Sequence, residues 1–150
     1  MSETGINDGM FGMSIELEPT PESVVSAADF VEEWLDARAV PIKPKARLMV
    51  AVDEIYSNIV RCSAATRAEL SVAKKDGDVV LTFRDNGTPF NPLELEDPDI
   101  AAPAEERALG GLGIFIVKKT MDDVRYEQVE GDNVLTLVLG VWREPAEVDA

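Results

Sequence analysis

Three polar side chains repeat at helical spacing in the segment that follows Pro44. Glu54, Asn58 and Arg61 lie four and three residues apart, so on an α-helix they form one stripe. This stripe lies roughly 80–140° around the helix from the centre of the apolar stripe. A carboxylate, an amide and a guanidinium at such a rim can act as general base, metal ligand and phosphate contact. The alternative is a solvated helix face without a chemical role.

A carboxylate follows an apolar run of strand-like pattern. Val79, Leu81 and Phe83 alternate with other residues and predict the core face of a strand. The same alternation places Asp85 on that face, where burying its charge is costly unless donors such as an adenine amino group satisfy it. Gly87 has no Cβ and lets a flat base approach the backbone. The alternative is that Asp85 only opens a turn, as Asp-Asn-Gly sequences often do.

A third candidate site is the run Gly110-Gly111-Leu112-Gly113, which precedes an apolar segment of helical period. Glycines at a helix start leave backbone N–H groups free to face an anion such as phosphate. The run is not a Walker loop, because no Gly-Lys-Ser/Thr follows, and it is not a dinucleotide fingerprint, because no strand precedes it. A flexible hinge with a tight helix entry is the alternative, and it is compatible with phosphate binding.

The composition limits the chemistry and the partners. The net charge of -15 over 150 residues argues against nucleic acid or an anionic membrane surface as the main partner, since both require Lys and Arg. There is no histidine, so proton transfer falls to a carboxylate, a lysine, a tyrosine or water. The single cysteine, Cys62, excludes an intrachain disulfide, and we expect it to be a buried apolar residue late in a helix.

No apolar run approaches the ~20 residues of a membrane span. Residues 1–12 lack the basic start and apolar stretch of a signal peptide. We therefore expect a cytoplasmic protein without a membrane partner.

The elements that must position these groups follow from periodicity and turn residues. A hydroxyl cap at Thr20 with Pro21 in the first turn predicts the first helix, and Asp76-Gly77 predicts a hairpin. Residues 88–109 have no clean period and predict a long loop. The other expected elements are strands at 13–18, 67–73, 79–84, 124–130 and 134–139, a helix at 45–64 and a short helix from the glycines to about 121.

This order predicts an α+β fold, a two-layer α/β sandwich with one mostly antiparallel sheet covered by helices on one face. We expect one domain over residues 13–140, with a flexible N-terminus over 1–12 and a C-terminal tail over 141–150.

Taken in order, Glu54-x-x-x-Asn58, Asp85-Asn86-Gly87 and Gly111-Leu112-Gly113 resemble the successive boxes of the gyrase/Hsp90/histidine-kinase/MutL ATPase fold. Within that fold, the segments AVDEIYSNIVR, FRDNGTPFNP and GGLGIFIVKKTMDDVRYE are similar to the small anti-sigma-factor serine/threonine kinases. The resemblance covers about residues 13–140. It implies the histidine kinase-like ATPase fold, with ATP and Mg²⁺ as cofactors.

The resemblance also implies roles for the polar residues of the first two sites. Asn58 would coordinate Mg²⁺, Glu54 would be the general base, and Arg61 matches a position that often carries a cation near the phosphates. Asp85 would bind the adenine N6 amino group, with Gly87 beside it.

For the glycine-rich segment, the resemblance implies phosphate binding. Gly111 and Gly113 would hold the phosphates under a lid that spans about residues 88–110. Arg107 would be the lid cation, although several relatives carry an arginine where this chain has Leu109.

The function implied is a kinase that transfers the γ-phosphoryl group of ATP to a serine or threonine of a small partner protein. In relatives the partner is an anti-sigma-factor antagonist, whose unphosphorylated form releases a sigma factor from the kinase, and the kinase is commonly a homodimer. One alternative is a nucleotide-gated binding module with little or no turnover. Another is the detached catalytic domain of a sensor histidine kinase, which would need an external histidine domain.

Overall fold

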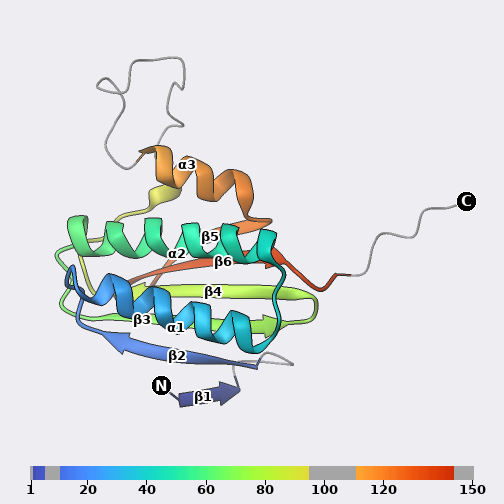
Figure 1. The fold of residues 1–150 in the computed structure, drawn as a ribbon. Helices are drawn as coiled ribbons and strands as arrows, with labels where there is room; N and C mark the ends of the chain where they lie inside the picture. Colours follow the sequence, from blue (N-terminus) through green and yellow to red (C-terminus); the bar gives the residue numbers. More distant parts are fainter. Residues whose placement is uncertain (1, 6–10, 95–110, 144–150) are drawn as a thin grey trace, which may run out of the picture.

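One antiparallel sheet carries three α-helices on one face in the computed structural model, which describes residues 2–5, 11–94 and 111–143 (Figure 1). The strand order is β1-β2-β3-β4-β6-β5. The strands are β1 Ser2–Gly5, β2 Phe11–Leu17, β3 Ala68–Lys75, β4 Asp78–Asp85, β5 Asp123–Val129 and β6 Asp132–Gly140. The helices are α1 Ser23–Ala37, α2 Ile42–Cys62, α3 Gly111–Thr120 and the short 3₁₀ helix η1 Pro92–Glu94. The expected α+β two-layer sandwich is confirmed.

Strand β4 lies in the interior of the sheet and presents its predicted face to the core. Val79, Leu81 and Phe83 are each no more than 1% exposed. The next inward position is Asp85, which is 6% exposed. Strict alternation along a strand therefore does bring a carboxylate to the buried side of the sheet, at the end of β4.

The connection between β5 and β6 is shorter than expected. The turn is Glu130–Gly131, with φ of 53° and 85°, and not the four residues 130–133. Positive φ at both central residues is the geometry of a tight two-residue hairpin, and it matches the twist of the flanking strands. As a result Asn133 belongs to β6, where it pairs directly opposite Asp85 of β4.

The helix starts agree with capping chemistry but shift by a few residues. The Thr20 N–H donates to Ser23 Oγ at 3.0 Å, and the Ser23 N–H donates to Thr20 Oγ1 at 3.3 Å, so the Thr20 hydroxyl does bind a backbone N–H. The helix itself begins only at Ser23, and its N-cap residue Glu22 makes no side-chain cap. Helix α2 begins at Ile42 and not at 45, because Pro44 fits in a first turn, where its missing N–H has no helical partner. None of the helices in the described ranges is long and apolar enough to cross a membrane.

Both ends of the described chain make backbone contacts with the sheet. Within the N-terminus that we expected to be flexible, Ser2–Gly5 forms β1 and pairs with the start of β2. At the other end, the N–H groups of Val141 and Trp142 both donate to Gly77 O, at 2.9 and 2.8 Å. The expected tail is therefore attached to the β3–β4 turn at its first residues.

A buried hydroxyl pair connects the first two helices. Ser23 Oγ lies 2.5 Å from the hydroxyl of Tyr56, which is 1% exposed. Ser23 Oγ also donates to Thr20 O at 2.7 Å, so the Tyr56 hydroxyl is the donor in the pair. Burial raises the pKa of Tyr56, which keeps this donor protonated.

We expect Ser23→Ala to destabilise the protein more than Tyr56→Phe. The Tyr56→Phe change removes one hydrogen bond and should cost about 1 kcal/mol, whereas Ser23→Ala leaves the buried Tyr56 hydroxyl unpaired and should cost about 2–3 kcal/mol. Urea unfolding followed by circular dichroism measures both free energies. Equal losses, or a larger loss for Tyr56→Phe, would contradict this account of the pair.

Candidate functional site

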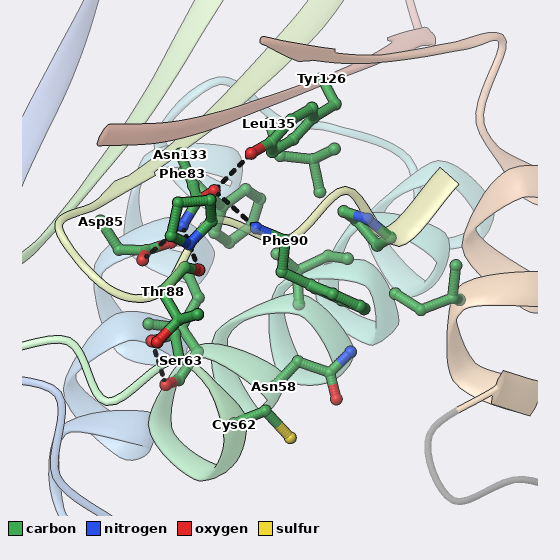
Figure 2. A pocket seen from close by; sticks show the side chains of 15 residues that line it. Asn58, Cys62, Ser63, Phe83, Asp85, Thr88, Phe90, Tyr126, Asn133 and Leu135 are labelled. Atoms are coloured by element: carbon green, nitrogen blue, oxygen red, sulfur yellow. Dashed lines mark hydrogen bonds between the residues drawn. The ribbon is translucent and has the colours of Figure 1, made fainter. Parts of the chain in front are cut away.

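A cavity of about 470 Å³ opens between α2, α3 and the end of the sheet where β4 stops and β6 begins (Figure 2). Its walls are mostly apolar, with few polar groups among them, a composition that suits a flat organic ligand such as a base. The apolar walls include Ile55, Ile59, Phe83, Ile114 and Leu135. The polar side chains include Asn58, Asp85, Tyr126 and Asn133.

Asp85 lines this cavity, and only one of its two carboxylate oxygens accepts hydrogen bonds from the described residues. Its Oδ1 accepts the Gly87 N–H at 2.9 Å and the Nδ2 group of Asn133 at 3.2 Å. Within the described ranges, no donor is bonded to Oδ2. The contact with Gly87 is the turn expected from an Asp-Asn-Gly sequence, so turn formation and ligand binding are compatible roles. A ligand N–H group in the cavity would satisfy the second oxygen.

Gly87 packs against the end of α2. A Cβ at this position would lie 2.6 Å from Ser63 Cβ and 2.7 Å from Ser63 Oγ. The next residue continues the contact, since the Thr88 N–H donates to Ser63 O at 2.7 Å. The structure thus gives Gly87 a packing role that sequence reasoning missed. The approach of a flat base to its backbone stays a prediction.

Two residues from separate predicted sites, Glu54 and Gly113, are in contact. A Cβ on Gly113 would overlap Oε2 of Glu54 and would lie 2.6 Å from its Cδ atom. Gly111 is the first residue of α3, so both glycines lie in its first turn and not ahead of the helix. The N–H groups of a first turn lack helical acceptors. The contact therefore holds a carboxylate beside a set of backbone donors.

Asn58 and Arg61 are also in contact, on the exposed side of α2. The Arg61 Nη2 group donates to Asn58 Oδ1 at 2.9 Å. Asn58 lines the cavity, and its amide oxygen is a ligand type that Mg²⁺ accepts. The described residues contain no cluster of three acidic, His or Cys ligands. A lone amide oxygen still fits Mg²⁺, which commonly takes its other ligands from water and substrate phosphates.

The predictions for Cys62 and for the lid segment remain to be compared with the structure. Cys62 is exposed, so the expectation of a buried apolar filler is wrong. The reason is its place as the last residue of α2, where the helix borders the cavity and not the packed core. Arg107 and most of the expected lid lie outside the described residues. At the start of that lid, Thr88 and Phe90 form part of the cavity wall.

Sequence reasoning missed Asn133 and Tyr126 as site residues. Asn133 is 6% exposed and accepts the hydroxyl of Tyr126 at its Oδ1. The signal that could have found Asn133 is the hairpin itself. With Glu130–Gly131 as a two-residue turn, Asn133 enters the strand and becomes a buried polar residue that needs partners.

Comparisons with known proteins identify the family of this chain. The family model of the histidine kinase-like ATPase domain matches residues 17–139. Serine/threonine-protein kinase BtrW of Bordetella bronchiseptica is 27% identical over 112 residues, which are 69% of this chain and 79% of that protein. Serine-protein kinase RsbW of Listeria monocytogenes is 30% identical over 103 residues, which are 59% of this chain and 61% of that protein.

Two solved structures share the fold. The crystal structure of RsbU and RsbW domains from Mycobacterium tuberculosis matches with a TM-score of 0.65 at 19% identity, covering 91% of this chain and 34% of that one. The Acinetobacter baumannii histidine kinase AdeS matches with a TM-score of 0.50 at 16% identity, covering 85% and 68%. Together with the family match over most of its length, these findings show that the chain belongs to the histidine kinase-like ATPase domain family.

Proposed function

We propose that the cavity binds the adenine of ATP and that the phosphates extend toward the start of α3. The observation that carries this proposal is the buried Asp85, whose Oδ2 has no donor within the described ranges. The adenine N6 amino group supplies such a donor. The apolar walls, including Ile59 and Phe83, suit the faces of a base. Backbone N–H groups at Gly111 and Gly113 suit phosphate oxygens.

The chain is a protein kinase that transfers a phosphoryl group from the bound ATP to a serine or threonine of a small partner protein. The support is the sequence similarity to proteins named as serine/threonine-protein and serine-protein kinases. By resemblance, the partner is an anti-sigma-factor antagonist, and the chain acts as an anti-sigma factor that releases a sigma factor when it binds the unphosphorylated antagonist. A cytoplasmic homodimer is part of the same proposal.

The catalytic residues are supplied by α2. Glu54 accepts the proton of the attacking hydroxyl, because a chain without histidine must use another base and this carboxylate lies against Gly113 of α3. Asn58 would hold Mg²⁺ through its amide oxygen once Arg61 no longer donates a hydrogen bond to that oxygen. The chemistry that Mg²⁺ would supply there is neutralisation of the phosphate charge. Arg61, once released, and Arg107 of the lid are the cations for the phosphates.

Asp85→Asn should weaken ATP binding severely while the protein stays folded. The change replaces the acceptor facing the amino group with an amide, and losing a hydrogen bond to a charged group costs on the order of tenfold to more than a hundredfold in affinity. Isothermal titration calorimetry measures the affinity. Asp123→Asn is the matched control, since Asp123 bonds the exposed Arg125. Undiminished affinity in Asp85→Asn would refute the adenine assignment.

Asn58→Ala should make ATP binding much less dependent on Mg²⁺, because the proposed amide ligand is lost. Affinity for ATP is measured with Mg²⁺ and with a chelator, and the ratio of the two values is compared with that of the native protein. Ser57→Ala, one residue away on α2, should keep the native ratio. An unchanged ratio in Asn58→Ala would place the metal elsewhere.

Glu54→Gln should keep ATP binding but reduce phosphoryl transfer on the order of 10²–10⁴-fold, because glutamine cannot accept a proton as a base. The assay incubates γ-labelled ATP and Mg²⁺ with the products of neighbouring genes and follows label on their serines and threonines. Asp53→Asn makes a comparable change at the adjacent exposed position and is the control. Native protein that binds ATP yet labels no partner would favour the nucleotide-gated module over the kinase.

A further inference from the structure

A single buried amide, that of Asn133, joins three segments in the wall of the cavity. Asn133 Nδ2 donates to Asp85 Oδ1 at 3.2 Å and to Thr88 O at 3.0 Å. Asn133 Oδ1 accepts the Phe90 N–H at 3.1 Å and the Tyr126 hydroxyl. The amide on β6 thereby connects the end of β4, the segment after it and β5 (Figure 2).

The hydrogen-bonding capacity of this amide is fully used. An asparagine side chain has two N–H donors and an oxygen that accepts two hydrogen bonds, and all four have partners. The partners also fix which way the amide faces. Rotated by 180°, its oxygen would face the Asp85 carboxylate and its NH₂ group would face the Phe90 N–H.

This arrangement has a consequence for Asp85. The Asn133 donor is directed at Oδ1, so Oδ2 is the oxygen left to accept from a ligand. The same amide holds Thr88 and Phe90, which form part of the cavity wall. Asn133 therefore shares the Asp85 carboxylate with the Gly87 N–H, and it supplements the bond from Thr88 to Ser63 O that also holds the adjoining wall.

We propose that Asn133 is a positioning residue for nucleotide recognition. It orients Asp85 so that one oxygen faces the base, and it fixes the 88–90 segment against the sheet. The proposal rests on the proposed ATP site. Asn133 acts through Asp85 and the 88–90 backbone, because its own donors and acceptors are already occupied.

Two variants of Asn133 separate these effects. Asn133→Asp keeps the acceptors for the Phe90 N–H and the Tyr126 hydroxyl but loses the donors to Asp85 and to Thr88 O, and it places a second carboxylate beside Asp85. Asn133→Leu has a similar volume and removes all four hydrogen bonds. The titratable groups that contact this side chain within the described ranges are Asp85 on β4 and Tyr126 on β5.

The first measurement is ATP affinity by calorimetry between pH 5.5 and pH 8. At pH 8 we expect Asn133→Asp to bind ATP roughly tenfold to a hundredfold more weakly than the native protein. The loss should shrink as the pH falls, because two adjacent carboxylates raise the pKa of one of them and the proton taken up restores a donor between them. A loss with the same size at every pH, or no loss, would overturn the role of Asn133 in orienting Asp85.

The matched control is Asn86→Asp. This change places a carboxylate of the same size one residue from Asp85, but Asn86 bonds Thr66 and Arg67 and does not line the cavity. Its ATP affinity should stay within about twofold of the native value, since an exposed charge is screened by solvent. Equal losses in the two variants would attribute the effect to added charge and overturn the proposal.

The second measurement is amide hydrogen exchange in the absence of nucleotide. The Phe90 N–H should exchange faster in Asn133→Leu than in the native protein and should stay protected in Asn133→Asp, which retains the acceptor. Exchange at the native rate in Asn133→Leu would overturn the proposed anchoring of the 88–90 segment. This result does not require ATP binding, so failure of the proposed function and failure of the anchoring role are distinguishable.

Discussion

The cost of burying the Asp85 carboxylate is the constraint on which the site depends. A charge that is 94% removed from solvent needs hydrogen-bond donors, and two of them come from Gly87 and Asn133. The Gly87 N–H reaches the carboxylate only through the tight turn after β4. The second donor requires an amide side chain at position 133 of β6. The second oxygen has no protein donor within the described ranges, and Asp85 lines the cavity. A ligand with an amino group completes a set of hydrogen bonds that the protein leaves one short.

The second constraint is the approach of α3 to α2. Glu54 and Gly113 touch only because residue 113 has no side chain, and any Cβ there would displace the carboxylate. The distance between the proposed base and the proposed phosphate donors is therefore set by helix packing. Hydrogen bonds shape the proposed adenine end of the site, whereas close van der Waals contact shapes the proposed phosphate end.

Local periodicity predicted most of the fold and part of the site. The period of two along β4 located Asp85 on the core face, and the period of 3.6 along α2 located Glu54 and Asn58 at the rim of the core. Periodicity did not locate Asn133, because the expected hairpin turn was two residues longer than the observed one. The longer turn would place Asn133 in a loop, whereas the shorter one places it in a buried strand position. Nor did periodicity reveal the contacts of Gly113 with Glu54 and of Gly87 with Ser63. These contacts join segments far apart in the chain, and their form depends on how the elements pack.

The exposed position of Cys62 has a practical consequence. Its thiol stands in the wall of the cavity, at the end of α2, and the whole chain contains no second cysteine. A thiol-reactive fluorophore therefore attaches at one place without any prior mutation. Dye emission depends on local polarity and on nearby aromatic rings, and the cavity wall includes Tyr126 and Phe90. The native chain thus carries an optical reporter position for occupancy of its own cavity.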